Sequence, residues 1–214
     1  MTAPSSWVIA DPVAGRPLGS GVARMTLENR NKAGRRRRLF QRVALAWSVA
    51  LLSAIPTPSP AETTAKDIMV AVRTFGFVVH PPTGEVPLAV VFDPTRPQSA
   101  SDLQTVISVL DGGAHVGGMT VQPVPIPVTE LNRLVGFRFV LLIGDVQNYR
   151  QAIFERTRGQ GIVTISTDLD CVRAGLCVMG VAAEPRVQVL VNRAASDAAA
   201  VEFMLAFRMM ITEL

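Results

Sequence analysis

The sequence predicts a single α/β domain of three layers, in which helices cover both faces of a mostly parallel sheet. Apolar runs alternate with amphipathic segments from Val86 to Ile165, and this spacing is typical of β-α-β units. The run Val86 to Phe92 is apolar almost throughout, which indicates a strand buried on both faces. After Cys177 the pattern changes. Two short runs, 178–182 and 187–191, predict an antiparallel hairpin near the C-terminus.

Charge is unevenly distributed along the chain. The 214 residues have a formal net charge of +4, but residues 1–61 hold nine Lys or Arg residues against two acidic ones. This leaves 12 basic and 15 acidic residues for 62–214, a net charge of −3. The basic character therefore belongs to the N-terminal part, and we expect no nucleic acid as a partner.

Residues 25–61 predict a signal peptide. Four consecutive arginines, 35–38, precede a 13-residue apolar stretch, Val43 to Ile55. Small residues at Ser59 and Ala61 then predict cleavage between Ala61 and Glu62. A membrane anchor is the alternative, although a spanning helix needs about 20 apolar residues.

Residues 1–24 match neither a signal nor a folded domain, so we interpret them as a non-native or upstream extension. Met1 and Met25 are both candidate starts. Arg37-Arg38-Leu39-Phe40 resembles a twin-arginine signal, and the general secretory route is the other possibility. Either route leads to the periplasm and leaves residues 62–214 as the folded domain.

Export determines the meaning of the two cysteines, Cys171 and Cys177. In an oxidising compartment a pair six positions apart predicts a structural disulfide, with Gly175 providing backbone freedom. Loop-closure entropy makes such a short ring worth about 2–2.5 kcal/mol. A metal site would need more ligands than two thiolates, and His80 and His115 are distant in sequence. Redox catalysis usually uses a C-x-x-C spacing. We therefore expect no metal and no cofactor.

The remaining segments are assigned by periodicity and turn residues. Residues 63–79 favour a helix over a strand, with a stripe of Ile68, Val72, Phe75 and Val79. The other expected elements are a helix capped by Ser99 or Ser101 and ending at Leu110, a helix stop and turn at 112–118, an edge strand or connector at 119–127, a short helix capped by Thr129, a strand at 137–143, a helix at 147–158, a strand at 162–165, a cap or turn at Asn192, and a mostly helical segment at 194–214.

No catalytic motif is present. The sequence lacks G-x-S-x-G and H-E-x-x-H, and its glycine-rich segment 112–118 lacks the Lys-Ser/Thr of a P-loop. We therefore expect a protein that is not an enzyme.

Candidate contact residues follow the strand predicted at 162–165. The D-x-D sequence Asp168-Leu169-Asp170 is compatible with binding of a divalent cation, but turn capping is the favoured interpretation of these aspartates. Open α/β sheets bind ligands at the carboxyl ends of their strands. Thr167, Asp168, Asp170 and Arg173 are therefore the candidate ligand or partner contacts.

The stretch from 161 to 195 resembles the YfiR-like family of periplasmic regulator proteins. The resemblance rests on the strand Ile162-Val163-Thr164-Ile165-Ser166, the loop with Cys171, Gly175 and Cys177, and the run Val187 to Asn192 before Ala194-Ala195. It implies an α/β domain that restrains a membrane-bound diguanylate cyclase by contact with the cyclase's periplasmic part, and in which disulfides affect integrity. This chain departs from the family in two ways. It lacks the second cysteine pair of the family's founding member, and its C-terminal end is only roughly similar to the family's.

Two functions follow as hypotheses. The first is a periplasmic interaction protein that restrains an inner-membrane signalling enzyme by direct contact, with a homodimer as a possible form. The alternative is a small-solute-binding module with its ligand near Thr167 to Arg173. The sequence names neither the partner nor the ligand.

Overall fold

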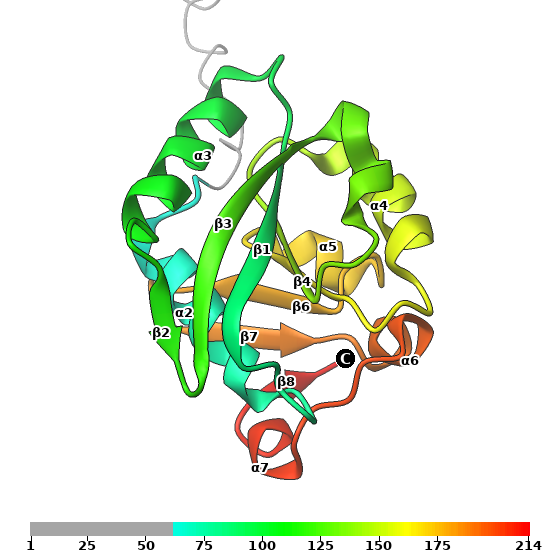
Figure 1. Ribbon diagram of the computed structural model, residues 1–214. Coiled ribbons are helices and arrows are strands. Elements are labelled where there is room, and N and C mark those ends of the chain that lie inside the picture. Colours follow the sequence, from blue (N-terminus) through cyan, green and yellow to red (C-terminus); the bar gives the residue numbers. More distant parts are fainter. Residues whose placement is uncertain (1–61) are drawn as a thin grey trace, which may run out of the picture. The chain divides into compact units, whose positions relative to one another are not determined.

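The computed structural model describes residues 62–214. The predicted extension (1–24) and signal peptide (25–61), including Ala61 of the cleavage site, lie outside the described residues. An eight-stranded sheet forms the middle layer, with helices on both faces (Figure 1). The strands are β1 (Gly84–Phe92), β2 (Ala114–Val116), β3 (Met119–Pro127), β4 (Phe139–Leu142), β5 (Val163–Ser166), β6 (Met179–Ala182), β7 (Gln188–Val191) and β8 (Thr212–Glu213). The helices are α2 (Ala65–Thr74), α3 (Pro97–Val109), α4 (Arg150–Thr157), α5 (Leu169–Arg173), α6 (Arg193–Ala199) and α7 (Leu205–Arg208), with 3₁₀ helices η1 (Phe75–Phe77), η2 (Val128–Leu134) and η3 (Gln147–Tyr149). No helix within 62–214 is long and apolar enough to cross a bilayer.

The strand order is β2-β3-β1-β4-β5-β6-β7-β8. Strands β3, β1, β4, β5 and β6 run parallel, and β7 forms the predicted antiparallel hairpin with β6. Strand β8 pairs in parallel with β7 through two residues. The predicted α/β class, with a mostly parallel sheet and an antiparallel hairpin near the C-terminus, is confirmed.

A second antiparallel pair lies at the other edge of the sheet. Strand β2 pairs with the start of β3 through a turn at Gly117 and Gly118, and Gly117 has a φ of 57°. The sequence predicted only a helix stop and turn over 112–118. The extra strand forms because Gly117-Gly118 is a two-residue hairpin turn that reverses the chain against β3. This signal is local in the sequence, and the predicted helix stop missed it.

The place of strand β3 in the sheet explains why it tolerates three prolines. It pairs with β1 along all nine residues, whereas β2 covers only Met119 to Val121 on the other side. Pro123, Pro125 and Pro127 are spaced by two, so their missing N–H groups all belong to one side of the strand. A free edge tolerates that loss. The predicted edge strand is therefore confirmed from Gln122 onward.

The sheet is buried on both faces by two hydrophobic cores. In β1, Val86, Leu88 and Val90 enter one core, while Ala89 and Val91 enter the other. Strand β4 divides its side chains in the same way. Helices α2 and α3 cover the first core, and η2, α4 and the disulfide cover the second. The apolar runs therefore reflect burial on both sides, as predicted.

Helix α2 begins at a capping box. The Thr64 hydroxyl accepts the Asp67 N–H at 3.2 Å, and the Asp67 carboxylate accepts the Thr64 N–H at 2.9 Å. The other Asp67 oxygen accepts the Ala183 N–H at 2.6 Å, which ties α2 to the end of β6. The helical prediction for this segment is correct, but Val78 is buried in place of Val79 because the chain becomes extended after η1.

The C-terminal segment corrects the sequence prediction. Residues 194–214 are not mostly helical, because α6 ends at Ala200 in the left-handed region with a φ of 56°. The chain then runs extended and buries Val201 and Phe203, whose spacing of two fits a strand. Phe203 forms a β-bridge to Val78. Tertiary pairing therefore overrides the helix propensity of the alanine-rich sequence.

Two predicted caps are also wrong. Helix α3 begins at Pro97 rather than after Ser99 or Ser101, because proline is well suited to the first helical position. The helix η2 begins at Val128, before Thr129, and has no side-chain cap. Asn192 does cap a helix, since its Oδ1 accepts the Ala195 N–H of α6 at 2.9 Å.

The predicted disulfide joins Cys171 of α5 to Cys177, with Cα atoms 5.4 Å apart. Both cysteines are fully buried in the second core, and Gly175 has a φ of 71°. The disulfide covers the sheet as well as closing the loop.

Replacing both cysteines by alanine is expected to lower the free energy of unfolding by at least about 2 kcal/mol, from loop entropy and lost packing. Urea unfolding checks this value. Adding reductant should destabilise the wild type and leave the double variant unchanged, and equal sensitivity of both proteins to reductant would contradict the assignment.

Candidate functional site

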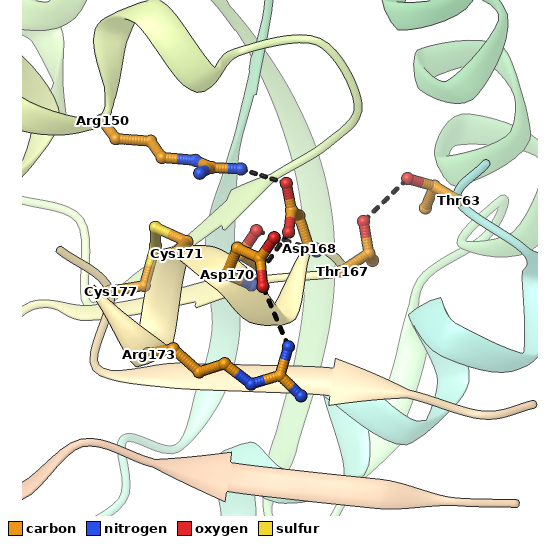
Figure 2. Close-up of polar contacts among 9 residues, drawn as sticks. Thr63, Arg150, Thr167, Asp168, Asp170, Cys171, Arg173 and Cys177 are labelled. Carbon is orange, nitrogen blue, oxygen red and sulfur yellow. Dashed lines mark hydrogen bonds and ion pairs between the residues drawn. A yellow bond between two sulfur atoms is a disulfide. The ribbon is translucent and has the colours of Figure 1, made fainter. Parts of the chain in front are cut away.

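The candidate residues lie at the carboxyl end of β5, beside the ends of β1 and β4 (Figures 1 and 2). The chain leaves β1 towards α3 on one face and leaves β4 towards α4 on the other. Such a divergence marks the position where open α/β sheets bind ligands. The geometry of Thr167, Asp168, Asp170 and Arg173 decides whether this edge is open.

Asp168 is occupied by two intramolecular contacts. One carboxylate oxygen accepts the Asp170 N–H at 2.9 Å and caps α5, and the other pairs with Arg150 of α4. Figure 2 shows both contacts converging on this side chain. The capping interpretation of this aspartate is confirmed, and the ion pair joins the loop after β5 to α4.

Asp170 and Arg173 do not join Asp168 in a site. They form an exposed pair with each other at 2.9 Å, one turn apart on α5. Within residues 62–214, no group of three or more His, Cys, Asp or Glu side chains is placed to hold a metal ion. The two aspartates of the D-x-D therefore have different surroundings and different contacts.

Thr167 takes part in a buried polar network. Its hydroxyl lies 3.0 Å from that of Thr63, which is also buried. The Thr63 N–H donates to Asp102 Oδ2 at 3.4 Å, and Gln98 Nε2 donates to Asp102 Oδ1 at 2.8 Å. The segment before α2 is thereby tied over the carboxyl edge of the sheet.

Sequence reasoning missed Asp102 and Gly144 in this network. Asp102 is 1% exposed, although it lies in an amphipathic helix. A Cβ atom at Gly144 would lie 2.5 Å from Asp102 Oδ2, so glycine permits this close approach. The available signal was an aspartate on the apolar face of α3, one turn before Val106.

The network closes the predicted site. The hollow beside Gly144, Arg150 and Asp168 holds about 10 Å³, which is roughly the space of one water molecule. Thr167 and Asp168 join loops, and the hollow that they line is too small for a solute. Asp170 and Arg173 lie outside this hollow and are exposed. This edge of the sheet is structural in the conformation described.

Replacing Gly144 with alanine is expected to lower the free energy of unfolding by about 1–3 kcal/mol, because the new methyl group displaces Asp102. Gly76→Ala is the matched control, since its Cβ would make only an ordinary 3.5 Å contact with Val116. Thermal unfolding of both variants gives the comparison. A Gly144→Ala protein as stable as the control would contradict the close approach.

A larger hollow lies between α6 and the α7–β8 segment. Its volume is about 420 Å³, and charged side chains of both signs line it. Arg208 and Glu213 form a paired contact across it, with distances of 2.5 and 3.1 Å. The hydrogen bond from Arg208 lowers the pKa of Glu213, and Glu213 raises the pKa of Arg208.

The other charged side chains of this hollow are unpaired. Among residues 62–214, Arg193, Asp197 and Glu202 have no ion-pair partner within 4.0 Å. All three are exposed. The charged hollow, defined by Arg193, Asp197, Glu202, Arg208 and Glu213, therefore offers both a cationic and an anionic contact.

Exposed apolar side chains gather on a second surface, which we call the apolar face. It is formed by Met69 of α2, Val187 before β7 and Met210 after α7. The exposed side chains of Leu205 and Met209 lie on the same short segment as Met210. Met69 and Val187 line one hollow of about 370 Å³, and Val187 and Met210 line another of about 340 Å³. Val187, Leu205, Met209 and Met210 are each 61–80% exposed. A concentration of exposed apolar side chains is typical of an interaction surface.

The likeness of this chain to known proteins is limited to its fold. No protein-family model matches it, and no curated protein matches it. Among solved structures it is similar to the ABC domain in complex with L-Trp from Streptococcus pneumonia, with a TM-score of 0.50 and 5% sequence identity. The match covers 71% of this chain and 62% of that one. At this identity the comparison concerns the fold alone. The class of protein is an α/β domain with a mostly parallel sheet.

Proposed function

We propose that this chain is a periplasmic small-solute-binding module and that its solute binds in the charged hollow. The observation that carries the proposal is the volume of about 420 Å³, lined by charged side chains of both signs. Small-molecule sites typically measure about 300–1,000 Å³. The disulfide is compatible with an oxidising compartment. The similarity in fold to a domain in complex with L-Trp adds support.

The lining suggests the chemical class of the solute. Arg193 offers a guanidinium group for a carboxylate, and Asp197 and Glu202 offer carboxylates for an ammonium group. A free amino acid carries both charges. The buried side chains of Val201 and Phe203 form the apolar part of the wall. A zwitterionic amino acid is therefore the solute that we propose.

Calorimetric titration of the purified protein with a panel of free amino acids tests this proposal. At least one amino acid is expected to bind, and Arg193→Ala and Glu202→Gln should each weaken binding about tenfold, through loss of a charge-assisted contact. Arg156→Ala and Glu85→Gln are matched exposed controls away from the hollow. Failure of every amino acid to bind, or equal losses in the controls, would contradict the proposal.

A second candidate function is the contact regulation of a membrane-bound signalling enzyme. It is favoured by the apolar face, together with the resemblance of residues 161–195 to the YfiR-like family. In this proposal the apolar face contacts the periplasmic part of a diguanylate cyclase-type enzyme in the inner membrane. It requires neither a cofactor nor chemistry by this chain.

Crosslinking in cells tests this second candidate. A photoreactive residue in place of Met210 should give an adduct with an inner-membrane protein that carries a diguanylate cyclase domain. The same substitution at Val135, which is 61% exposed and lies outside the apolar face, should give none. An adduct containing only a second copy of this chain would instead indicate a homodimer and contradict the regulatory role.

A further inference from the structure

The charges that line the apolar face are basic, with Glu184 as an acidic neighbour. Lys66, Arg73 and Arg186 line its two hollows and a third hollow of about 310 Å³, which Val187 and Met210 also line. Lys66 is neutralised by Glu184 at 2.6 Å. Within 62–214, Arg73 and Arg186 have no ion-pair partner and are exposed. A basic rim surrounds this face although the domain as a whole is net acidic.

Two highly exposed apolar side chains lie close in sequence to Met210 of the apolar face. Leu205 of the short helix α7 and Met209 directly after it are 71% and 80% exposed, and α7 lies at one end of the domain in Figure 1. These long side chains are spaced by four residues and therefore share one side of the helix. Apolar side chains with basic neighbours are the combination that binds the interface of an anionic bilayer.

The predicted signal peptide would bring the start of α2 near a membrane during export. Helix α2, which carries Met69 and Arg73, begins ten positions after Ile55, the last residue of the apolar stretch 43–55. Ten residues span at most about 35 Å, and this length limits the distance between Ile55 and the start of α2.

We propose that the apolar face docks on an anionic lipid surface, with Leu205, Met209, Met210 and Val187 entering the interface and Arg73 and Arg186 contacting lipid phosphates. This proposal is independent of solute binding in the charged hollow, because its lipid-contacting residues do not line that hollow. It is an alternative to contact with a cyclase, because both partners would cover the same apolar face. Its electrostatic part predicts sensitivity to salt, since exposed charges are screened over about 8 Å at physiological ionic strength.

Co-sedimentation with vesicles tests the proposal. Residues 62–214 hold both hydrophobic cores and form part of one compact unit, so this fragment can be used without the apolar stretch 43–55. Wild-type protein is expected to bind vesicles of equal parts phosphatidylethanolamine and phosphatidylglycerol at low salt. It should bind phosphatidylcholine vesicles at least about tenfold more weakly.

Matched variants separate the two contributions. The double variant Arg73→Gln/Arg186→Gln should lower binding to anionic vesicles about tenfold, and Arg96→Gln/Arg156→Gln should leave it unchanged. Val187→Ser should weaken binding, whereas Val135→Ser should not, and both valines are 61% exposed. Thermal unfolding of each variant checks that it remains folded.

Three outcomes would overturn the proposal. The first is an absence of binding to anionic vesicles at low salt by the folded wild type. The second is an equal loss in the two arginine double variants or in the two valine variants. The third is a wild-type protein that does not bind vesicles but sediments as a dimer, and whose dimer is dissociated by Val187→Ser. A second copy would then cover the apolar face.

Discussion

The central strands β1 and β4 must be covered on both faces, and the rest of the structure depends on this requirement. Their side chains enter two separate cores. Because each core needs its own helices, the chain leaves β1 towards one face and β4 towards the other. That divergence normally opens a ligand crevice at the carboxyl edge. Here Thr63, Thr167 and Asp102 fill it with a hydrogen-bonded network, and Gly144 permits the close approach of Asp102.

Because the carboxyl edge of the sheet is closed, the candidate binding surfaces lie in the C-terminal third of the domain. At the carboxyl edge, Asp102 and Asp168 have partners inside the protein. Around α6, α7 and β7, both charged and large apolar side chains are left exposed. Buried polar groups are normally satisfied within a protein, so unpaired groups gathered around hollows are the better candidates for an external partner.

The α7–β8 segment belongs to both surfaces. Arg208 and Glu213 line the charged hollow, and Met210 lines a hollow of the apolar face. The segment is held by the stacking of Phe207 on Phe77, at 4.7 Å between ring centres, and by the two-residue pairing of β8 with β7. The two surfaces are therefore physically connected through this segment, and a partner on either surface contacts the same short element.

The sequence by itself determined the α/β class, the buried strands β1, β4 and β5, the C-terminal hairpin and the Cys171–Cys177 disulfide. These features are local, because they follow from apolar runs, turn residues and cysteine spacing. Tertiary structure alone decided that Thr167 and Asp168 join loops and line only a water-sized hollow, since their partners Thr63 and Arg150 come from other elements. It also decided that residues after Ala200 run extended, because pairing of Phe203 with Val78 outweighs local helix propensity. Contacts between segments distant in sequence carry no local pattern, and they set which surfaces remain open.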